Sequence, residues 1–412
     1  MARKGSSNGE RKILDRGTPA FYGMFMRSVE LFSGAGGLAL GLEQSGFEPV
    51  ALVEKNRHAC ATLRMNRPQW NVLEGNIQEI DFNEFSGVEL VAGGPPCQPF
   101  SMGGKAKGYN DQRDMFPEAV RAVRQIRPKA FLFENVRGLL RSSFRNYVQF
   151  IRLQLTYPDF PVSQNVPWED NLRRLERFHT SSEAGGSLNY RVTINLADAA
   201  DYGVPQRRHR VFFVGFRSDV NAEWFFPKPT HSVEELNRAQ RENGDYWSGH
   251  QLAVPKKYDD KIVTSPVVQE EMGFVDRPLR WSTVRDAITD LGHPRLSNFH
   301  DSHFFQAGAR SYPGHTGSPL DSPSKALKAG DHGVPGGENM LRYENGKVRY
   351  FSIRESARIQ TFPDDWRFSG SWTESMRQLG NAVPVELALK VAESVAQHIV
   401  PDHGKRRSLQ SS

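Results

Sequence analysis

The chain has 412 residues and a mass of 46.5 kDa, enough for two or three domains of about 150 residues each. Hydrophobic residues make up 38% and charged residues 24%, and no apolar run approaches the roughly 20 residues that span a bilayer. This composition excludes a membrane-spanning or largely disordered protein and favours a soluble globular one. The formal net charge of +6 permits a polyanionic partner without requiring one.

Cys60 and Cys97 are the only cysteines of the sequence. Two cysteines cannot build a disulfide framework, and a cysteine-based zinc site needs at least two of them close together. His300, His303 and His315 lack a cysteine or compact acidic partner, so we expect them to hydrogen-bond within loops or to a ligand, and we expect no metal. The polar N-terminus lacks the apolar core of a signal peptide, so we expect the protein to stay where it is made.

In chain order, residues 1–27 form a polar extension and residues 401–412 a similar tail. Between residues 28 and 217, short apolar runs rich in β-branched and aromatic residues alternate with helical segments. This alternation predicts an α/β fold with a parallel, doubly wound sheet. The predicted strands are Ser28–Phe32, Pro49–Val53, Val88–Ala92, Ala130–Phe133 and Arg210–Gly215.

The other segments differ in composition. Residues 142–187 contain Pro and Gly clusters that indicate an excursion from the sheet. Residues 218–350, with frequent Pro, Gly and His, predict a smaller, loop-rich module with one helix at Ser282–Leu291. In the last segment, residues 351–400, apolar residues at three- and four-residue spacing predict a helix over Pro384–Ile399 that packs one face on the rest of the chain.

A glycine-rich turn follows the first predicted strand. Gly34, Gly36 and Gly37 let the backbone turn tightly and let a ligand approach with no Cβ in the way. Glu54 ends the next strand, where its carboxylate can accept hydrogen bonds from a ribose. This pattern predicts an adenosine-containing cofactor. Because Gly34-x-Gly36-x-x-Ala39 also satisfies the loose dinucleotide fingerprint, a nicotinamide cofactor stays open on these residues alone.

Cys97 lies in Gly93-Gly-Pro-Pro-Cys-Gln-Pro-Phe-Ser101, after the predicted strand Val88–Ala92. In an open α/β sheet, ligands bind beyond the carboxyl ends of strands. The prolines leave the backbone few free dihedrals, so we interpret the thiol as held for attack rather than buried as packing. Cys60 stands in a helix-like sequence, and we interpret it as an inert core residue.

Further charged residues follow the later strands. Glu134 comes directly after Ala130–Phe133, so its carboxylate can face the thiol from a second carboxyl end. Arg208 and Arg210 alternate at the start of the strand Arg210–Gly215 and share one face, where they indicate a clamp for a base or a phosphate. The Gly/Lys-rich stretch 101–113 has the composition of a lid for a phosphate-bearing partner, with an unliganded loop as the alternative.

With these residues together, the chain resembles the DNA (cytosine-5) methyltransferases of bacterial restriction–modification systems. The resemblance extends from Val29 to Ile399 and rests on six motifs in the family's own order. The matching motifs are Phe32-Ser-Gly-Ala-Gly-Gly37, Pro95-Pro-Cys-Gln98, Glu134-Asn-Val136, Gln206-Arg-Arg-His-Arg210, Arg354-Glu-Ser-Ala-Arg-Ile-Gln-Thr-Phe-Pro-Asp364 and Gln378-Leu-Gly-Asn-Ala-Val383.

The resemblance implies a fold and a set of roles. Residues 28–217 would form a catalytic domain of the S-adenosyl-L-methionine-dependent methyltransferase type, with residues 142–187 as an insertion. Residues 218–350 would form a linker and a target-recognition domain, and residues 351–400 would return to complete the catalytic domain. Cys97 would be the nucleophile, Glu134 would contact N3 and the exocyclic amine of cytosine, and Arg208 and Arg210 would support the flipped base and its phosphate.

The resemblance also implies the binding residues. Asn76 stands where the family usually has an aspartate, so the acceptor for the adenine amine is uncharged here. The cofactor would contact Phe32, Ser33, Gly34, Gly36, Gly37, Glu54, Asn76, Ile77, Pro96, Asn381 and Val383. DNA contacts are expected at Gln98, Ser101, Lys105, Lys107 and Arg113, and the DNA sequence would be chosen by about Asp276 to Tyr350.

The implied activity is transfer of a methyl group from S-adenosyl-L-methionine to carbon 5 of a cytosine flipped out of a short double-stranded DNA sequence. It would proceed through a covalent bond from Cys97 to carbon 6, and it would protect host DNA from a restriction endonuclease that shares the target site. The alternatives are a DNA-binding regulator of the same fold without turnover, a tRNA cytosine-5 methyltransferase, and a nicotinamide oxidoreductase, which leaves Pro95-Pro-Cys-Gln98 unexplained. We expect a monomer in the bacterial cytoplasm, with no membrane contact.

Overall fold

The computed structural model describes residues 26–96, 114–163, 165–186, 188–256, 277–296, 302–330 and 337–399. Met26 and Arg27 belong to the first strand rather than to the predicted extension at 1–27, and the predicted tail at 401–412 lies outside the described residues. Also outside them lie Cys97, His300 and the expected DNA contacts Gln98, Ser101, Lys105, Lys107 and Arg113.

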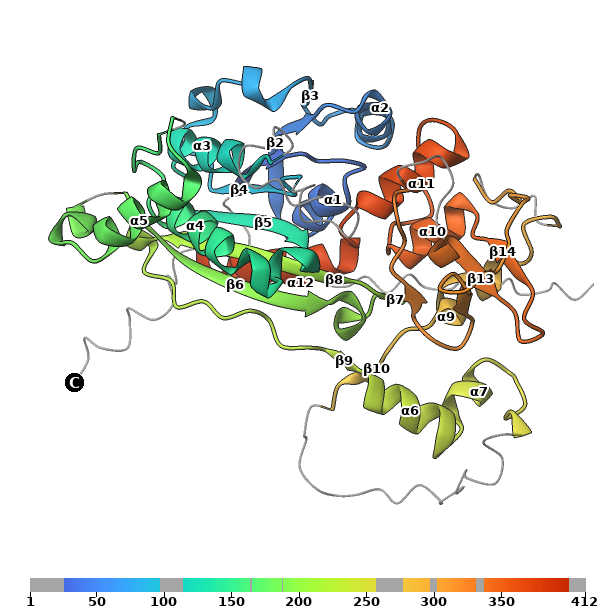
Figure 1. Cartoon of the computed structure of the whole chain (residues 1–412). Helices are drawn as coiled ribbons and strands as arrows, with labels where there is room; N and C mark the ends of the chain where they lie inside the picture. Colours follow the sequence, from blue (N-terminus) through green and yellow to red (C-terminus); the bar gives the residue numbers. More distant parts are fainter. Residues whose placement is uncertain are drawn as a thin grey trace, which may run out of the picture.

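A seven-stranded sheet forms the centre of the protein (Figure 1). Its strand order is β3-β2-β1-β4-β5-β8-β6. The direction in which strands are added reverses between β1 and β4, and in open α/β sheets such a switch point is where ligands bind. The strands are β1 Met26–Leu31, β2 Phe47–Glu54, β3 Val72–Glu74, β4 Leu90–Gly93, β5 Ala130–Val136, β6 Tyr190–Asp198 and β8 His209–Arg217.

The five predicted strands are confirmed, but one direction differs. Strands β1 to β5 pair in parallel, whereas β8 pairs antiparallel with both β5 and β6. The expectation of a wholly parallel sheet is therefore wrong for Arg210–Gly215. The connection from Asp198 to His209 is too short for a crossover, so β8 must run back beside β6.

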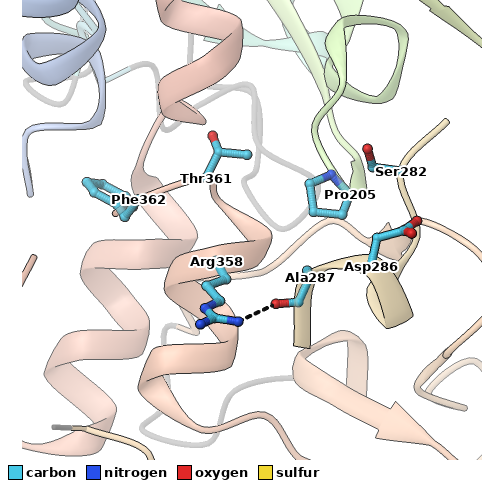
Figure 2. Close-up of a pocket in the computed structure, with 7 residues that line it drawn as sticks. All are labelled: Pro205, Ser282, Asp286, Ala287, Arg358, Thr361 and Phe362. Carbon is cyan, nitrogen blue, oxygen red and sulfur yellow. Dashed lines mark hydrogen bonds between the residues drawn. The ribbon is translucent and has the colours of Figure 1, made fainter. Parts of the chain in front are cut away.

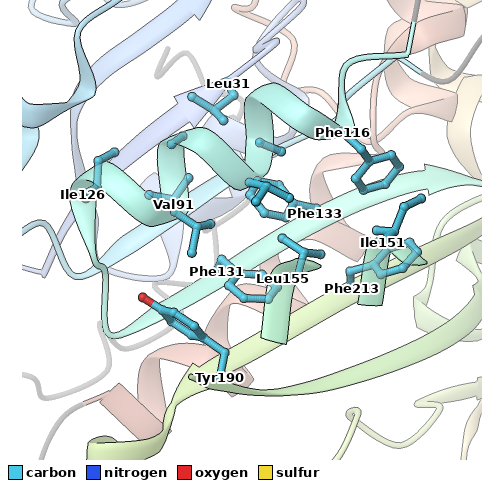
Figure 3. Close-up of a cluster of buried hydrophobic side chains, with 14 of the residues drawn as sticks. Leu31, Val91, Phe116, Ile126, Phe131, Phe133, Ile151, Leu155, Tyr190 and Phe213 are labelled. Carbon is cyan, nitrogen blue, oxygen red and sulfur yellow. The ribbon is translucent and has the colours of Figure 1, made fainter. Parts of the chain in front are cut away.

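Helices cover both faces of the sheet. On one face lie α3 Phe116–Ile126 and α4 Arg145–Thr156, with α5 Trp168–His179 against α4. Figure 3 shows Phe131 and Phe133 of β5 in the same cluster as Phe116 of α3 and Leu155 of α4. The prediction of an excursion at 142–187 is therefore wrong for α4, which is part of the main hydrophobic core.

The opposite face is covered by α1 Gly37–Gln44 and α12 Val385–Ile399. The predicted helix Pro384–Ile399 is confirmed, and its apolar face is buried as expected. A Cβ added to Gly41 would lie 2.6 Å from the Cβ of Ala388, so the glycine permits the close approach of α1 and α12. The last segment of the chain thus packs on the first helix.

The remaining elements are short. The predicted helix Ser282–Leu291 is confirmed as α9 Val284–Ile288, which begins with a capping box between Thr283 and Asp286. The other helices are α2 Arg57–Asn66, α6 Val233–Arg241, α7 Asp245–Gly249, α10 Ile353–Ile359 and α11 Trp372–Asn381. The other strands are β7 Gln206–Arg207, β9 His231–Ser232, β10 Leu279–Arg280, β11 Ser318–Pro319, β12 Ser324–Lys325, β13 Met340–Arg342 and β14 Val348–Tyr350.

The short helix α10 links the two larger parts of the molecule. Its Ile359 is buried with α9 and β13, whereas its Ala357 is buried with residues of α1 and α11. Figure 1 shows α9, β13 and β14 beyond the end of the sheet at which β8 begins. Among the helices that the structure describes, none is both long and apolar enough to cross a bilayer.

Candidate active site

The glycine-rich turn that follows β1 has an unusual backbone conformation. Phe32 has φ 57°, Gly34 φ 54° and Gly36 φ 85°. Positive φ at a bulky residue such as Phe32 is rare, and such strained conformations are enriched at functional sites. No heavy atom of the described residues lies within 4 Å of a Cβ placed at Gly34, so the space beside it is open. A Cβ at Gly37 would instead lie 2.2 Å from the carbonyl oxygen of Val383.

The carboxylate of Glu54 is fixed beside this turn. Its Oε2 accepts a hydrogen bond from the Gly34 amide at 2.8 Å. Its Oε1 accepts from the amides of Lys55 at 2.8 Å and Asn56 at 2.7 Å. A carboxylate offers about four acceptor positions, so one stays open for a hydroxyl group. Glu54 and the open side of Gly34 thus form one surface at the end of β1 and β2.

The other predicted cofactor residues surround the same edge. Asn76 begins a short 3-10 turn, and its Oδ1 accepts a hydrogen bond from the Gln78 amide at 3.3 Å. Ile77 is buried next to it, whereas Pro96, after β4, is exposed. Ser33 is buried at the turn, and Asn381 is exposed at the end of α11, two residues before Val383.

These residues fit the adenosine part of S-adenosyl-L-methionine. The glycine turn leaves open space, Glu54 keeps an acceptor for a ribose hydroxyl, and Asn76 supplies a neutral amide beside them. Cys60 is a core residue, as expected: its thiol donates to the Glu54 carbonyl at 3.4 Å, and burial raises its pKa to about 12. That thiol stays protonated at neutral pH and is inert.

Glu134 and Arg210 form a buried ion pair at the end of β5. Because β8 runs antiparallel to β5, its first residues lie beside the last residues of β5, and Arg210 pairs with Val136. The Nε of Arg210 contacts Oε1 of Glu134, and their side chains are only 11% and 9% exposed. Burial raises the pKa of Glu134, although Arg210 and Arg208 oppose the rise.

Asn135 connects this pair to the segment that precedes Cys97. Its Nδ2 donates a hydrogen bond to the carbonyl of Pro95 at 3.0 Å, and its Oδ1 accepts from the Val136 amide at 2.8 Å. A Cβ at Gly94 would lie 3.2 Å from Oε2 of Glu134, so this segment passes directly along the carboxylate. Sequence reasoning gave Asn135 no role; its place between Glu134 and Val136 in the third motif was the available signal.

Arg208 is placed differently from Arg210. It is 1% exposed, and its guanidinium donates to the carbonyls of Leu327 at 2.8 Å and Gly380 at 2.6 Å. It therefore joins the start of β8 to the small module and to the end of α11. These partners are protein carbonyls, so its support of a flipped base stays a prediction.

Gln206 also connects β7 to Leu327. Its side-chain oxygen accepts from the Leu327 amide, and its Nε2 donates to Gln360 at 2.9 Å. A Cβ at Gly380 would lie 2.2 Å from the Ala329 amide, so the backbone at 327–329 is held tightly against the motif residues.

A cavity of about 300 Å³ opens where three segments of the chain meet (Figure 2). Arg358 of α10 borders it and donates to the carbonyl of Ala287 in α9 at 3.1 Å. No predicted catalytic or cofactor residue lines it, so it is separate from the Glu134–Arg210 pair. The lining residues are Pro205, Ser282, Asp286, Ala287, Arg358, Thr361 and Phe362.

Comparison with known proteins matches residues 26–397 to the C-5 cytosine-specific DNA methylases. The chain belongs to this family. As a C-5 cytosine-specific DNA methylase, it is a DNA (cytosine-5) methyltransferase, and the nicotinamide alternative is wrong. The predicted α/β fold with a doubly wound sheet of the methyltransferase type is confirmed.

Two relatives align with most of this methylase. Type II methyltransferase M.PspPI of Psychrobacter sp. (strain TA137) is 35% identical over 376 residues, which cover 89% of this chain and 78% of the relative. Type II methyltransferase M.NgoMIV of Neisseria gonorrhoeae is 34% identical over 381 residues, covering 92% and 98%. The solved structure of the S. pombe Dnmt2 methyltransferase has the same fold, with a TM-score of 0.54 at 17% identity over 90% of this chain and 98% of that one.

A second residue of the methylase went unnoticed in the sequence. Glu30 is the penultimate residue of β1 and is 1% exposed. Burial, and then the charge of Glu54, raise its pKa well above the usual value. A carboxyl group between Val29 and Leu31 in an apolar strand was the available signal.

Proposed function

We propose that this methylase attacks carbon 6 of cytosine with Cys97 and holds the ring at N3 with Glu134. The observation that supports this most is the contact chain at the end of β5: Glu134 is paired with Arg210, and its neighbour Asn135 binds Pro95, two residues before Cys97. A buried acid beside the segment that carries the thiol is the arrangement that addition to a pyrimidine needs.

The chemistry explains why both residues are needed. Carbon 5 of cytosine is a poor nucleophile, and addition of the Cys97 thiolate at carbon 6 makes it enamine-like. A proton held by Glu134 at N3 stabilises the electron density that moves onto the ring, which requires the raised pKa of its carboxyl group. S-adenosyl-L-methionine supplies the electrophilic methyl group. Loss of the carbon-5 proton and cleavage of the bond to Cys97 then restore the aromatic ring.

The cofactor would be held at the edge formed by β1 and β2. Glu54 would accept the ribose hydroxyl at its open acceptor position, and Gly34 would allow the close approach. Asn76 would accept the adenine amine without a charge, and Asn381 and Val383 would close the site from the last segment.

The target base must leave the duplex, because neither reacting carbon can be reached in stacked DNA. Flipping costs a few kcal/mol, which contacts to the DNA have to offset. Arg210 is placed beside Glu134, where it can also support the base. The stretch 101–113, which lies outside the described residues, is proposed to close over the DNA with Lys105 and Lys107.

Recognition of the DNA sequence is proposed for about Asp276 to Tyr350. Within this range, Leu327 to Ala329 are already fixed by Gln206, Arg208 and Gly380. Base contacts therefore have to come from the neighbouring parts of the range. We also propose that methylation protects host DNA against an endonuclease that shares the target site, as in type II restriction–modification systems.

The test is to express the protein with a plasmid, sequence the plasmid after bisulfite treatment, and assay purified protein on duplex DNA and on tRNA. We expect cytosines that resist bisulfite conversion within one short, recurring DNA sequence, and no methylation of tRNA. Methylation of tRNA without methylation of DNA would favour the tRNA methyltransferase. Binding of DNA without any protected cytosine would favour the regulator.

A further inference from the structure

We propose that the segment from Arg137 to Arg145, here called the arginine segment, binds phosphates of the DNA strand beside the flipped cytosine. The proposal rests on the proposed function, because the ligand is the same DNA duplex. Residues 135–158 contain four arginines and no Asp or Glu. This uncompensated positive charge lies directly after Glu134 in the sequence. It indicates a binding site for an anionic partner.

The position of the segment follows from the register of the sheet. Val136 pairs with Arg210, and Arg137 is the next residue along the chain. At about 3.4 Å per extended residue, Arg137 is within about 10 Å of Glu134 along the backbone. Phosphates of one strand are spaced about 3.4 Å apart along the duplex axis, so this distance covers about three nucleotides. Arg137 can therefore reach phosphates close to a base held by Glu134.

The guanidinium groups of the arginine segment are available for a ligand. Arg137, Arg141 and Arg145 are all exposed. Within the parts of the chain that the structure describes, no hydrogen bond or ion pair to their side chains is found. Many other arginines of the chain are neutralised, such as Arg121 by Glu118. The positive charge here is therefore neither buried nor compensated.

The backbone beneath these arginines is held in place. Leu139 lies between them in sequence and is fully buried in the main core. After the segment, Tyr147 and Phe150 of α4 are buried in the same core. The arginines are thus presented from an anchored surface, which lowers the ordering cost of binding.

Helix stability does not account for these residues. Arg145 occupies the first turn of α4, which contains no acidic residue. The amino end of a helix carries partial positive charge, so a cation there is unfavourable. A locally unfavourable charge is expected at positions kept for binding.

The experiment measures binding of the full-length protein to a duplex with its target site, over a range of salt concentrations. The variant replaces all three residues, Arg137→Gln, Arg141→Gln and Arg145→Gln. Each lost phosphate contact lowers the slope of log K against log salt by about 0.9, which is about eightfold in affinity at 0.1 M salt. We expect the slope to fall by about 2.7 and the affinity by roughly 500-fold. The ratio of affinities for target and non-target duplexes should stay the same.

Two further variants complete the test. The triple lysine variant, Arg137→Lys, Arg141→Lys and Arg145→Lys, keeps the charges and should keep the slope. Arg124→Gln is the matched control, because Arg124 is exposed and its side chain has no hydrogen-bond or ion-pair partner among the described residues, but it lies at the far end of α3, near the start of β5. A folded triple glutamine variant with the slope of the unmodified protein would overturn the proposal. Absence of DNA methylation by the unmodified protein would instead overturn the proposed function.

Discussion

Asn135 offers a test of how the active site is assembled. Replacing it with alanine removes the donor to the Pro95 carbonyl and the acceptor for the Val136 amide. Asn135 is 5% exposed, so both groups lose their partner in a buried place. Each buried group left unsatisfied costs about 1–3 kcal/mol, so Asn135→Ala should lower the free energy of unfolding by about 2–6 kcal/mol.

The effect on catalysis follows from the position of Pro95. Its carbonyl is fixed by Asn135, and the thiol of Cys97 follows two residues later in the sequence. A displacement of about 1 Å at a reacting group can cost about 10²-fold in rate. We therefore expect kcat of Asn135→Ala to fall by about 10- to 100-fold. The Kd for S-adenosyl-L-methionine should change much less, because Pro96 is the only expected cofactor contact in this segment.

The assay is transfer of a labelled methyl group to plasmid DNA at saturating DNA and cofactor, with urea unfolding in parallel. Asn135→Asp keeps an acceptor for Val136 but turns a carboxylate oxygen toward the Pro95 carbonyl at a buried position, so it should lose at least as much stability as the alanine variant and also lose rate. Asn195→Ala, at a β6 position whose Oδ1 has no hydrogen-bond partner in the described chain, is the control. If the kcat of folded Asn135→Ala were within twofold of that of the unmodified enzyme, the proposal that Asn135 positions the segment before Cys97 would be refuted.

Two further predictions concern the cofactor and the proton. Glu54→Ala should weaken binding of S-adenosyl-L-methionine by roughly 10- to 150-fold in calorimetry, because a hydrogen bond to a charged group is worth about 1.5–3 kcal/mol; Asn76→Asp should bind no worse. Arg210→Met should move the basic limb of the pH dependence of kcat/KM to higher pH. The reason is that the positive charge of Arg210 lowers the pKa of Glu134, and activity is lost as pH rises through that pKa.

Each of these predictions has an outcome that would contradict it. Unchanged calorimetry for Glu54→Ala would place the ribose elsewhere. A basic limb that stays fixed in Arg210→Met would mean that protonation of Glu134 does not limit the reaction at high pH.

Much of the fold could be predicted because each element carries its own pattern. The apolar runs gave five of the seven strands of the central sheet, without β3 and β6, and three- and four-residue spacing gave α12. The direction of β8 could not be predicted in this way, because a strand's own residues do not show which neighbour it pairs with. The core position of α4 could not be inferred from the Pro and Gly clusters at 158–161 and 183–187, because both lie after the helix, whose Tyr147 and Phe150 are buried.

The candidate site also contains residues that could be predicted from the sequence and contacts that could not. Glu54 and Glu134 stood out because charged residues follow apolar strands, and the sheet topology then places them at carboxyl ends. The partners of Arg208 and Asn135 depend on segments far away in sequence, Leu327 with Gly380 and Pro95 respectively. No local pattern records such contacts, so only the structure gives them.

The most direct test of the proposed mechanism is a trapping experiment with a target duplex that carries 5-fluorocytosine at the methylated position. Fluorine cannot leave carbon 5 as the proton does, so the bond between Cys97 and carbon 6 should persist after methyl transfer. Mass spectrometry should find a denaturation-resistant adduct on the peptide that contains Cys97, and Cys97→Ala should give none. An enzyme that methylates the normal duplex but forms no adduct, or forms it through another residue, would contradict the mechanism.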